Sequence, residues 1–343
     1  MNLTGFFPSA KLGWYVARMF LLRSFVILAM LVLVLQTLDL LGESGKILAV
    51  QGNAESDVWH YVALRLPQII ARFLPFSVLL GTILTLVTLN QNSEVVSMKA
   101  AGLSAHQVLA PLMLTSLLVA GVSFAFNDRI VSRASATLDK WEKVEFAALP
   151  KDSNAQINVW VRDGDDLIHA SVVSGKGDNA TLEDVTVYDR SGGSLQGIIE
   201  AKSGKFAGRG WQISGARRFE VASGKVQQLG EIVIAPTVRP DQFTLASVDP
   251  EGLSFRKLWD AIKNLKKAGR PTLELETELW HKISGPLSAL LMPLLAAVAA
   301  FGVARSGRLF VRAVIGMALG FAYFVADNFG LAMGNLGAYP PFL

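Results

Sequence analysis

Cysteine is absent from the 343 residues, and charged side chains are scarce. Without cysteine the chain has neither disulfides nor a cysteine-based metal or redox site. Asp, Glu, Lys and Arg make up 17% of the residues and hydrophobic residues 51%, whereas a typical soluble domain is about 25% charged. The composition therefore excludes a single soluble globule and indicates a chain that lies largely in a membrane.

Motifs for nucleotide binding and for metal-dependent hydrolysis are also absent from the sequence. No segment matches the phosphate-binding pattern GxxxxGK[ST], because no Gly-Lys pair is followed by Ser or Thr. HExxH does not occur, and the four His residues are scattered along the chain. We therefore expect no enzyme activity, no catalytic residue, no metal site and no cofactor bound by this chain.

Long uncharged runs recur along the chain. The clearest are Phe73–Ser93, Ala100–Asn127 and Ile283–Ala304, and two weaker runs are Ser24–Leu38 and Ala313–Ala326. Crossing the hydrocarbon core of a bilayer takes roughly 20 apolar residues in a helix. The sequence therefore predicts five membrane spans, at about 19–41, 62–89, 107–127, 280–303 and 310–330.

Basic residues at the ends of the spans predict the orientation, because cytoplasmic loops carry an excess of Lys and Arg. Two groups are relevant: Lys11, Arg18 and Arg23 before the first span, and Arg305, Arg308 and Arg312 between the last two. Both groups fall on the same side of the membrane if successive spans cross it in opposite directions. We expect that side, with the 92–106 loop, to be cytoplasmic, and residues 128–279 to be external. This sorting accounts for the net charge of +4 without nucleic acid as a partner.

The external segment has the pattern of a β domain. Residues 156–235 contain short alternating stretches such as INVWVRDGDDLIHASVV, in which a DGDD turn separates two strands, and a second turn is expected at 191–193. Short strands at regular spacing with Gly-rich turns predict an all-β sandwich or barrel-like domain. Helical spacing returns in residues 253–271, which end at a Gly and a Pro.

These patterns divide the chain into three parts. Residues 1–145 hold three spans, 146–250 form the external β domain, and 251–343 hold a linker helix and two further spans.

Polar residues cluster near the external ends of the first three spans. Sorted by helical face, the clusters are Gln36, Asp39 and Glu43; Arg65, Gln68 and Arg72; and Arg129, Arg133, Lys140 and Lys143. Ionisable groups at membrane depth usually face a partner or a cavity. The bases can form an anion site, in which Arg binds phosphate through paired hydrogen bonds, or they can extend to ordinary lipid headgroups. The two acids can simply neutralise them.

Between the second and third spans lies a short polar segment, NSEVVSMKAAGLS, that is too polar to cross a bilayer. Asn92 or Ser93 can cap a helix that carries Glu94 in its first turn, and Gly102 can end it. Val95, Met98 and Leu103 then form a short apolar edge. The sequence predicts a helix at about 92–103 that another protein can approach closely.

This segment resembles the coupling segment of the lipopolysaccharide-export permeases, the LptF/LptG family, also called YjgP/YjgQ. ELWHKISGPLSALLMPLLA and YFVADNFG with its later YPP are similar to the last third of the family. The order of three spans, a β domain and further spans is similar too, and the resemblance covers essentially the whole chain. WHKISGPLS and the DNFG end look more like the LptG branch than the LptF branch.

The resemblance implies a helical polytopic protein of the Gram-negative inner membrane, with an inserted jellyroll-like periplasmic domain. It implies a permease that pairs with its paralogue LptF, two copies of the cytosolic ATPase LptB, which would hold ATP and Mg, and the bridge protein LptC. Lipopolysaccharide would be extracted from the outer leaflet and passed to the bridge. The coupling Glu of the family corresponds to Glu94.

Two sets of site residues follow from the segment and the clusters. The set expected to couple to the ATPase is Glu94, Val95, Met98, Ala101, Gly102 and Leu103. The set expected to bind lipopolysaccharide is Arg65, Arg72, Arg129, Arg133 and Lys140.

The chain departs from the family pattern at two places. The family has six spans and five are visible, so we expect the natural chain to continue past Leu343 by one helix. LptG relatives can carry Lys near the outer end of the first span, where this chain has Gln36, Asp39 and Glu43. Two other functions stay open at this point: a mechanotransmitting subunit of the FtsX or MacB kind, and a membrane-embedded lipid-modifying enzyme.

Overall fold

The structure, a computed structural model, describes residues 9–149, 155–175, 177–190, 194–244, 249–267, 269–301 and 309–342. Its contacts divide the chain into two units. The first, here called the membrane unit, comprises Met1–Leu48, Ala54–Leu138 and Pro250–Leu343, and the second, the β unit, comprises Ala49–Asn53 and Asp139–Asp249. The predicted turn at 191–193 and the loop bases Arg305 and Arg308 lie outside the described residues, as does the side chain of Arg312.

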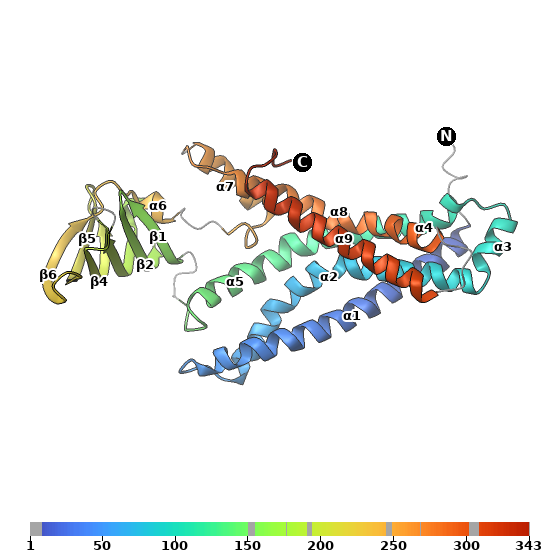
Figure 1. Ribbon diagram of the computed structural model, residues 1–343, viewed down its shortest axis with the longest axis horizontal. Helices are drawn as coiled ribbons and strands as arrows, with labels where there is room; N and C mark the ends of the chain where they lie inside the picture. The colour runs from blue at the N-terminus through green and yellow to red at the C-terminus, as the bar shows by residue number, and fades with distance from the viewer. Residues whose placement is uncertain are drawn as a thin grey trace. The chain divides into compact units, whose positions relative to one another are not determined.

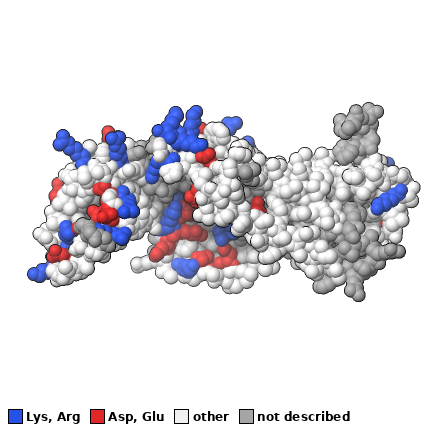
Figure 2. Space-filling view, turned by 45° about the horizontal axis from the view of Figure 1, so that its top comes forward, with Lys and Arg blue, Asp and Glu red and all other residues white. Residues whose placement is uncertain are grey.

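Five helices of the described chain are long and apolar enough to cross a membrane, and each matches one of the five predicted spans. The fourth predicted span, at 280–303, is described as far as Phe301. They are α1 (Ala10–Ala49), α2 (Glu55–Gln91), α4 (Ala105–Phe126) with its continuation, α8 (Leu273–Phe301) and α9 (Leu309–Asn335). On the face that Figure 2 shows, the middle of these helices carries almost no charged side chain. The polytopic helical fold is therefore confirmed.

Helices α2, α4 and α8 supply most of the core of the membrane unit (Figure 1). The first turns of α1 add Val16 and Phe20 to it, and α9 packs against it. Glycine allows the closest approaches. A Cβ added to Gly81 of α2 would lie 2.1 Å from Ser24 Oγ of α1, and one added to Gly320 of α9 would lie 2.2 Å from Leu79 Cδ2. The crossing of α1 and α2 therefore depends on the missing side chain, because the backbone of Ser24 is also close, whereas the end of the Leu79 side chain can rotate away.

The third span ends in a π-helical turn, η2 (Asn127–Val131), that leads into α5 (Ser132–Lys143). This turn presents Asp128, whose Oδ1 accepts a hydrogen bond of 2.6 Å from the backbone N–H of Phe255. That N–H begins α7 (Phe255–Lys267), so the carboxylate caps the helix where its unpaired N–H groups favour negative charge. The predicted apolar face of α7, Leu258, Ile262 and Leu265, is buried.

The β unit contains six described strands in one antiparallel sheet, and each strand pairs with the next along the chain. They are β1 (Gln156–Asp163), β2 (Asp166–Ser174), β3 (Thr181–Asp189), β4 (Gly197–Phe206), β5 (Trp211–Glu220) and β6 (Lys225–Ile234). The inserted all-β domain is confirmed. Its described strands form a single meander, where a sandwich or a jellyroll would need two packed sheets, because short turns pair each strand with its successor.

One face of the sheet carries the core of the β unit. Buried Val, Ile and Ala side chains surround Trp211 and Phe243, whose ring centroids are 4.9 Å apart. The indole N–H of Trp211 donates to the carbonyl oxygen of Val238 at 3.0 Å. Phe243 comes from the short helix α6 (Pro240–Thr244), which therefore closes this side of the sheet.

A line of irregular residues, here called the crease, crosses the described strands. One residue of each of the first five strands lies on this line: Asn158, Ser171, Asp184, Lys202 and Gly215. Each lies opposite the next on the adjacent strand, but the two do not pair in the ladder. Asn158, Asp184 and Gly215 have φ values of 54°, 47° and 70°, in the left-handed region. Such residues bend a strand and locally increase its twist.

Candidate functional site

The segment between α2 and α4 forms a separate short helix, α3 (Glu94–Ala100). Gly102 ends it in the left-handed conformation, with φ of 88°. The N–H of Gly102 donates to the carbonyl of Lys99 at 3.0 Å, and the N–H of Leu103 donates to that of Met98 at 3.1 Å. This pair of bonds is the Schellman arrangement, so the glycine ends the helix as predicted.

The start of α3 differs from the predicted helix at 92–103. Ser93 precedes the first helical residue, but its φ is 58° and its hydroxyl makes no capping bond. The amide of Asn92 instead donates to the Glu94 carboxylate at 3.2 Å. The helix is therefore shorter than expected, because a left-handed residue separates it from α2.

The residues predicted to couple to a partner divide into a buried and an exposed group. Val95 and Met98 are 4% and 8% exposed and belong to the core of the membrane unit, and Leu103 packs against that core. Ala101 and Gly102 are exposed. The apolar edge thus anchors α3 to its own bundle. A partner can reach the half-buried Glu94 at the start of α3, and Ala101 and Gly102 just past its end.

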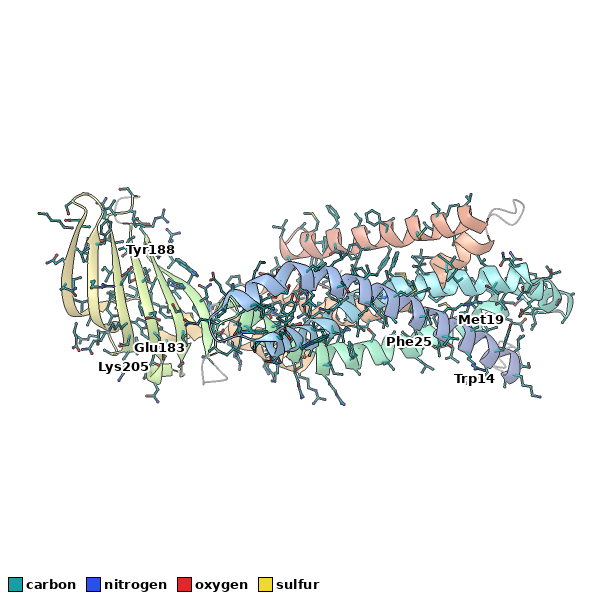
Figure 3. All side chains as sticks on the ribbon, turned by 90° about the horizontal axis from the view of Figure 1, so that it is seen from below. Trp14, Met19, Phe25, Glu183, Tyr188 and Lys205 are labelled. Atoms are coloured by element: carbon teal, nitrogen blue, oxygen red, sulfur yellow. The ribbon has the colours of Figure 1, made fainter. Side chains whose placement is uncertain are left out.

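Glu94 is half-buried and holds a tertiary contact that joins two helices. Its Oε1 accepts a hydrogen bond from the hydroxyl of Tyr15 at 3.3 Å as well as the one from Asn92. Tyr15 lies in the first turns of α1, whose labelled residues Trp14 and Met19 lie at the same end of the membrane unit as α3 (Figure 3). The carboxylate is therefore oriented by α1 and by the end of α2.

A second polar group lies at the end of the spans opposite α3. Asp39 of α1 accepts from the Tyr61 hydroxyl at 2.7 Å and from Arg65 Nε at 3.2 Å. Arg65 also donates to Gln68 Oε1 at 2.7 Å, and Gln68 donates to Ser135 Oγ at 3.1 Å. This network, here called the α1–α2 network, brings together the predicted clusters of the first two spans and uses the Arg65 guanidinium internally.

Gln36 lies one helical turn from Asp39 and is 9% exposed. Its amide nitrogen and oxygen are both buried, and neither has a hydrogen-bond partner among the described residues. Such an amide is costly to bury alone, so it marks the polar end of α1 as a place for a water molecule or a polar group of a ligand.

The remaining predicted lipopolysaccharide residues differ in burial and in the unit to which they belong. Arg72, Arg129 and Arg133 are exposed, and their guanidinium groups form no ion pair with a described residue. Lys140 is half-buried and belongs to the β unit. Three bases of the membrane unit thus present open guanidinium groups, whereas Arg65 does not.

Sequence reasoning missed Tyr15, Tyr61 and Ser135. Tyr61 precedes Arg65 by one helical turn, so helical spacing alone could have placed it in the cluster. Tyr15 is 79 residues from Glu94, and no local pattern links the two. Ser135 is also a tertiary neighbour, visible only once α5 packs near α2.

Comparison with known proteins places the chain in a family. The family model described as "Lipopolysaccharide export system permease LptF/LptG" matches residues 14–343. The lipopolysaccharide export system permease protein LptG of Escherichia coli K12 is 27% identical over 290 residues, which are 82% of this chain and 79% of that protein. The protein of the same name from Haemophilus influenzae is 24% identical over 289 residues, 81% of this chain and 78% of that protein. With a match across nearly its whole length, the chain belongs to the LptF/LptG family of lipopolysaccharide export permeases.

Proposed function

We propose that the chain is a membrane permease subunit of an ATP-driven lipopolysaccharide exporter. It extracts lipopolysaccharide from the outer leaflet of the inner membrane and passes it to a periplasmic bridge. Family membership and five helices able to span a membrane support the proposal. The α3 end then faces the cytoplasm, and the β unit lies in the periplasm.

The observation that carries the coupling step is the way α3 is attached. Val95 and Met98 fix one side of the helix in the bundle core, while its end at Ala101 and Gly102 is exposed. A force on the exposed end reaches the spans through close-packed side chains, which transmit displacement because protein interiors are nearly incompressible. The partner that supplies this force is an ATPase.

The proposed complex contains this chain, the paralogous permease LptF, two copies of the ATPase LptB and the bridge protein LptC. ATP and Mg bind to the ATPase. Within this chain the substrate contacts are assigned to Arg72, Arg129 and Arg133, whose open guanidinium groups can each form paired hydrogen bonds with a phosphate of lipid A. Arg65 instead orders the α1–α2 network through Asp39.

Affinity purification in mild detergent, followed by mass spectrometry, tests the coupling. The wild-type chain is expected to bring a cytosolic ATPase and a second permease with it. Glu94→Arg is expected to lose the ATPase or ATP-driven transport, because it reverses the charge at the first residue of α3, which corresponds to the coupling Glu of the family. Glu55→Arg is the matched control, since Glu55 is an exposed acid in the first turn of α2, at the far end of that helix.

Two results contradict the proposal. One is a wild-type chain that brings no ATPase under several mild conditions. The other is a Glu94→Arg variant with normal association and transport.

A further inference from the structure

The first turns of α1 share a buried core with α3. Val16 and Phe20 of α1 are 2% and 0% exposed and belong to the same core as Val95 and Met98 of α3. The chain does not connect these elements nearby, because α1 continues for 40 residues before it reaches α2 at the opposite end. A third span thus contributes to the core that holds α3, a helix covalently linked only to α2 and α4.

Tyr15 adds a directional contact to this packing. Tyr15 is 43% exposed, so its burial contributes less than that of Val16 or Phe20. Its hydroxyl donates to Glu94 Oε1 at 3.3 Å. Asn92 donates to the same oxygen from the end of α2. One carboxylate oxygen thus joins α1, the end of α2 and α3.

We infer that Tyr15 is a positioning residue for coupling: it holds the Glu94 carboxylate so that α1 moves together with α3. The inference rests on the proposed function, in which a partner ATPase displaces α3. Tyr15 does not touch the substrate; it acts through Glu94.

The length of α1 extends the effect of the Tyr15–Glu94 contact to the other end of that helix. A continuous helix of 40 residues is about 60 Å long and stiff, so a displacement at its first turns is carried along its axis. The far part of α1 holds Gln36 and Asp39, which belong to the polar end described above. Tyr15 therefore connects motion of α3 to the polar end of α1, without a route through α2 or α4.

A distance measurement tests the link. The chain has no cysteine, so spin labels can be attached to cysteines introduced at Lys11 of α1 and Ser97 of α3, which are both exposed. In the assembled complex we expect one narrow distance distribution with and without ATP. Tyr15→Phe, which removes only the hydroxyl, is expected to broaden it, most in the ATP-bound state. Trp14→Phe is the matched control, because Trp14 is the neighbouring aromatic residue and is 68% exposed.

A coupling measurement separates positioning from packing. Lipopolysaccharide released per ATP hydrolysed is expected to fall about two- to fivefold in Tyr15→Phe. This is less than for a buried hydrogen bond to a charged group, because this bond is long and partly exposed. Tyr15→Phe is expected to have no further effect in a Glu94→Gln background, because the partner of the hydroxyl is already altered.

Three results overturn the inference: an unchanged distance distribution in Tyr15→Phe, unchanged coupling, or additive effects of the two substitutions. Each leaves the complex with the ATPase intact. A failure of the proposed function is distinct, because the wild-type chain would then bring no ATPase at all. The distance measurement on the purified chain without ATP still tests the contact in that case.

Discussion

Neutralising Asp39 tests the α1–α2 network most directly. Asp39→Asn keeps the shape of the side chain and leaves an oxygen that can accept from the buried Tyr61 hydroxyl. It removes the negative charge that faces Arg65 Nε at 3.2 Å. Any loss of stability therefore reports mainly on the charge pair between α1 and α2.

The exposure of the pair sets the size of the effect. Arg65 and Asp39 side chains are 32% and 21% exposed, so the pair is neither a surface pair nor a fully buried one. Exposed pairs contribute about 0.2–1 kcal/mol, whereas breaking a buried pair costs about 3–5 kcal/mol. We expect Asp39→Asn to lower the free energy of unfolding by about 1–2 kcal/mol, nearer the exposed limit because neither side chain is fully buried in the protein.

The assay is reversible unfolding of the purified chain in mixed micelles. Glu43→Gln is the matched control, since Glu43 pairs with Lys46 on the same helix and that lysine is 65% exposed. The control is expected to cost less than about 0.5 kcal/mol. Arg65→Gln added to Asp39→Asn is expected to cost little more than Asp39→Asn alone. Equal losses at Asp39 and Glu43, or fully additive losses at Asp39 and Arg65, would refute the pairing.

Three further outcomes are expected. Gly81→Ala should destabilise the chain by about 1–3 kcal/mol, because the new Cβ overlaps Ser24, and Ser24→Gly should recover part of the loss in the same unfolding assay. Replacing Arg72 and Arg133 by Ala should weaken photocrosslinking of lipopolysaccharide to the chain, and unchanged crosslinking would contradict their assignment. Burial lowers the pKa of His169, so the unfolded β unit binds the extra proton and stability should fall as the pH drops below about 6.5, then level off below the depressed pKa. Urea unfolding followed by a label on the β unit measures this fall, which His169→Gln should remove.

The spans were predictable because an uncharged run of sufficient length has few alternative structures. Their ends were not, because helices continue into polar sequence beyond the hydrocarbon core. The fourth span shows this, since α8 begins at Leu273 although its uncharged run begins at Ile283. Helix length depends on hydropathy and on how the polar turns pack. The sequence of one segment gives the hydropathy but not the packing.

Tertiary contacts limited what could be predicted of the candidate site. The helix with Glu94 and its terminating Gly102 could be predicted, because capping and the left-handed glycine are local effects. That Val95 points inward and that Arg65 is engaged by Asp39 depend on neighbouring helices. Helical spacing in the sequence shows which residues lie on the same side of a helix, but it does not show what that side contacts.

The strand pattern likewise fixed the elements and left their pairing open. Short strands at even spacing suit a meander as well as a sandwich, and the choice depends on which edges meet. The left-handed conformation of Asn158 and Asp184 had no clear signal either, because both residues are also common in ordinary turns and strand ends.

The crease gives the sheet an anisotropic stiffness. Flexing about a line that joins Asn158 to Gly215 disturbs few inter-strand bonds, since the described ladder already skips those positions, whereas flexing about any other axis strains intact pairs. The sheet therefore behaves as two stiff plates joined along one compliant line. Bending along this line would change the curvature of the core face and leave the pairs on either side of it intact.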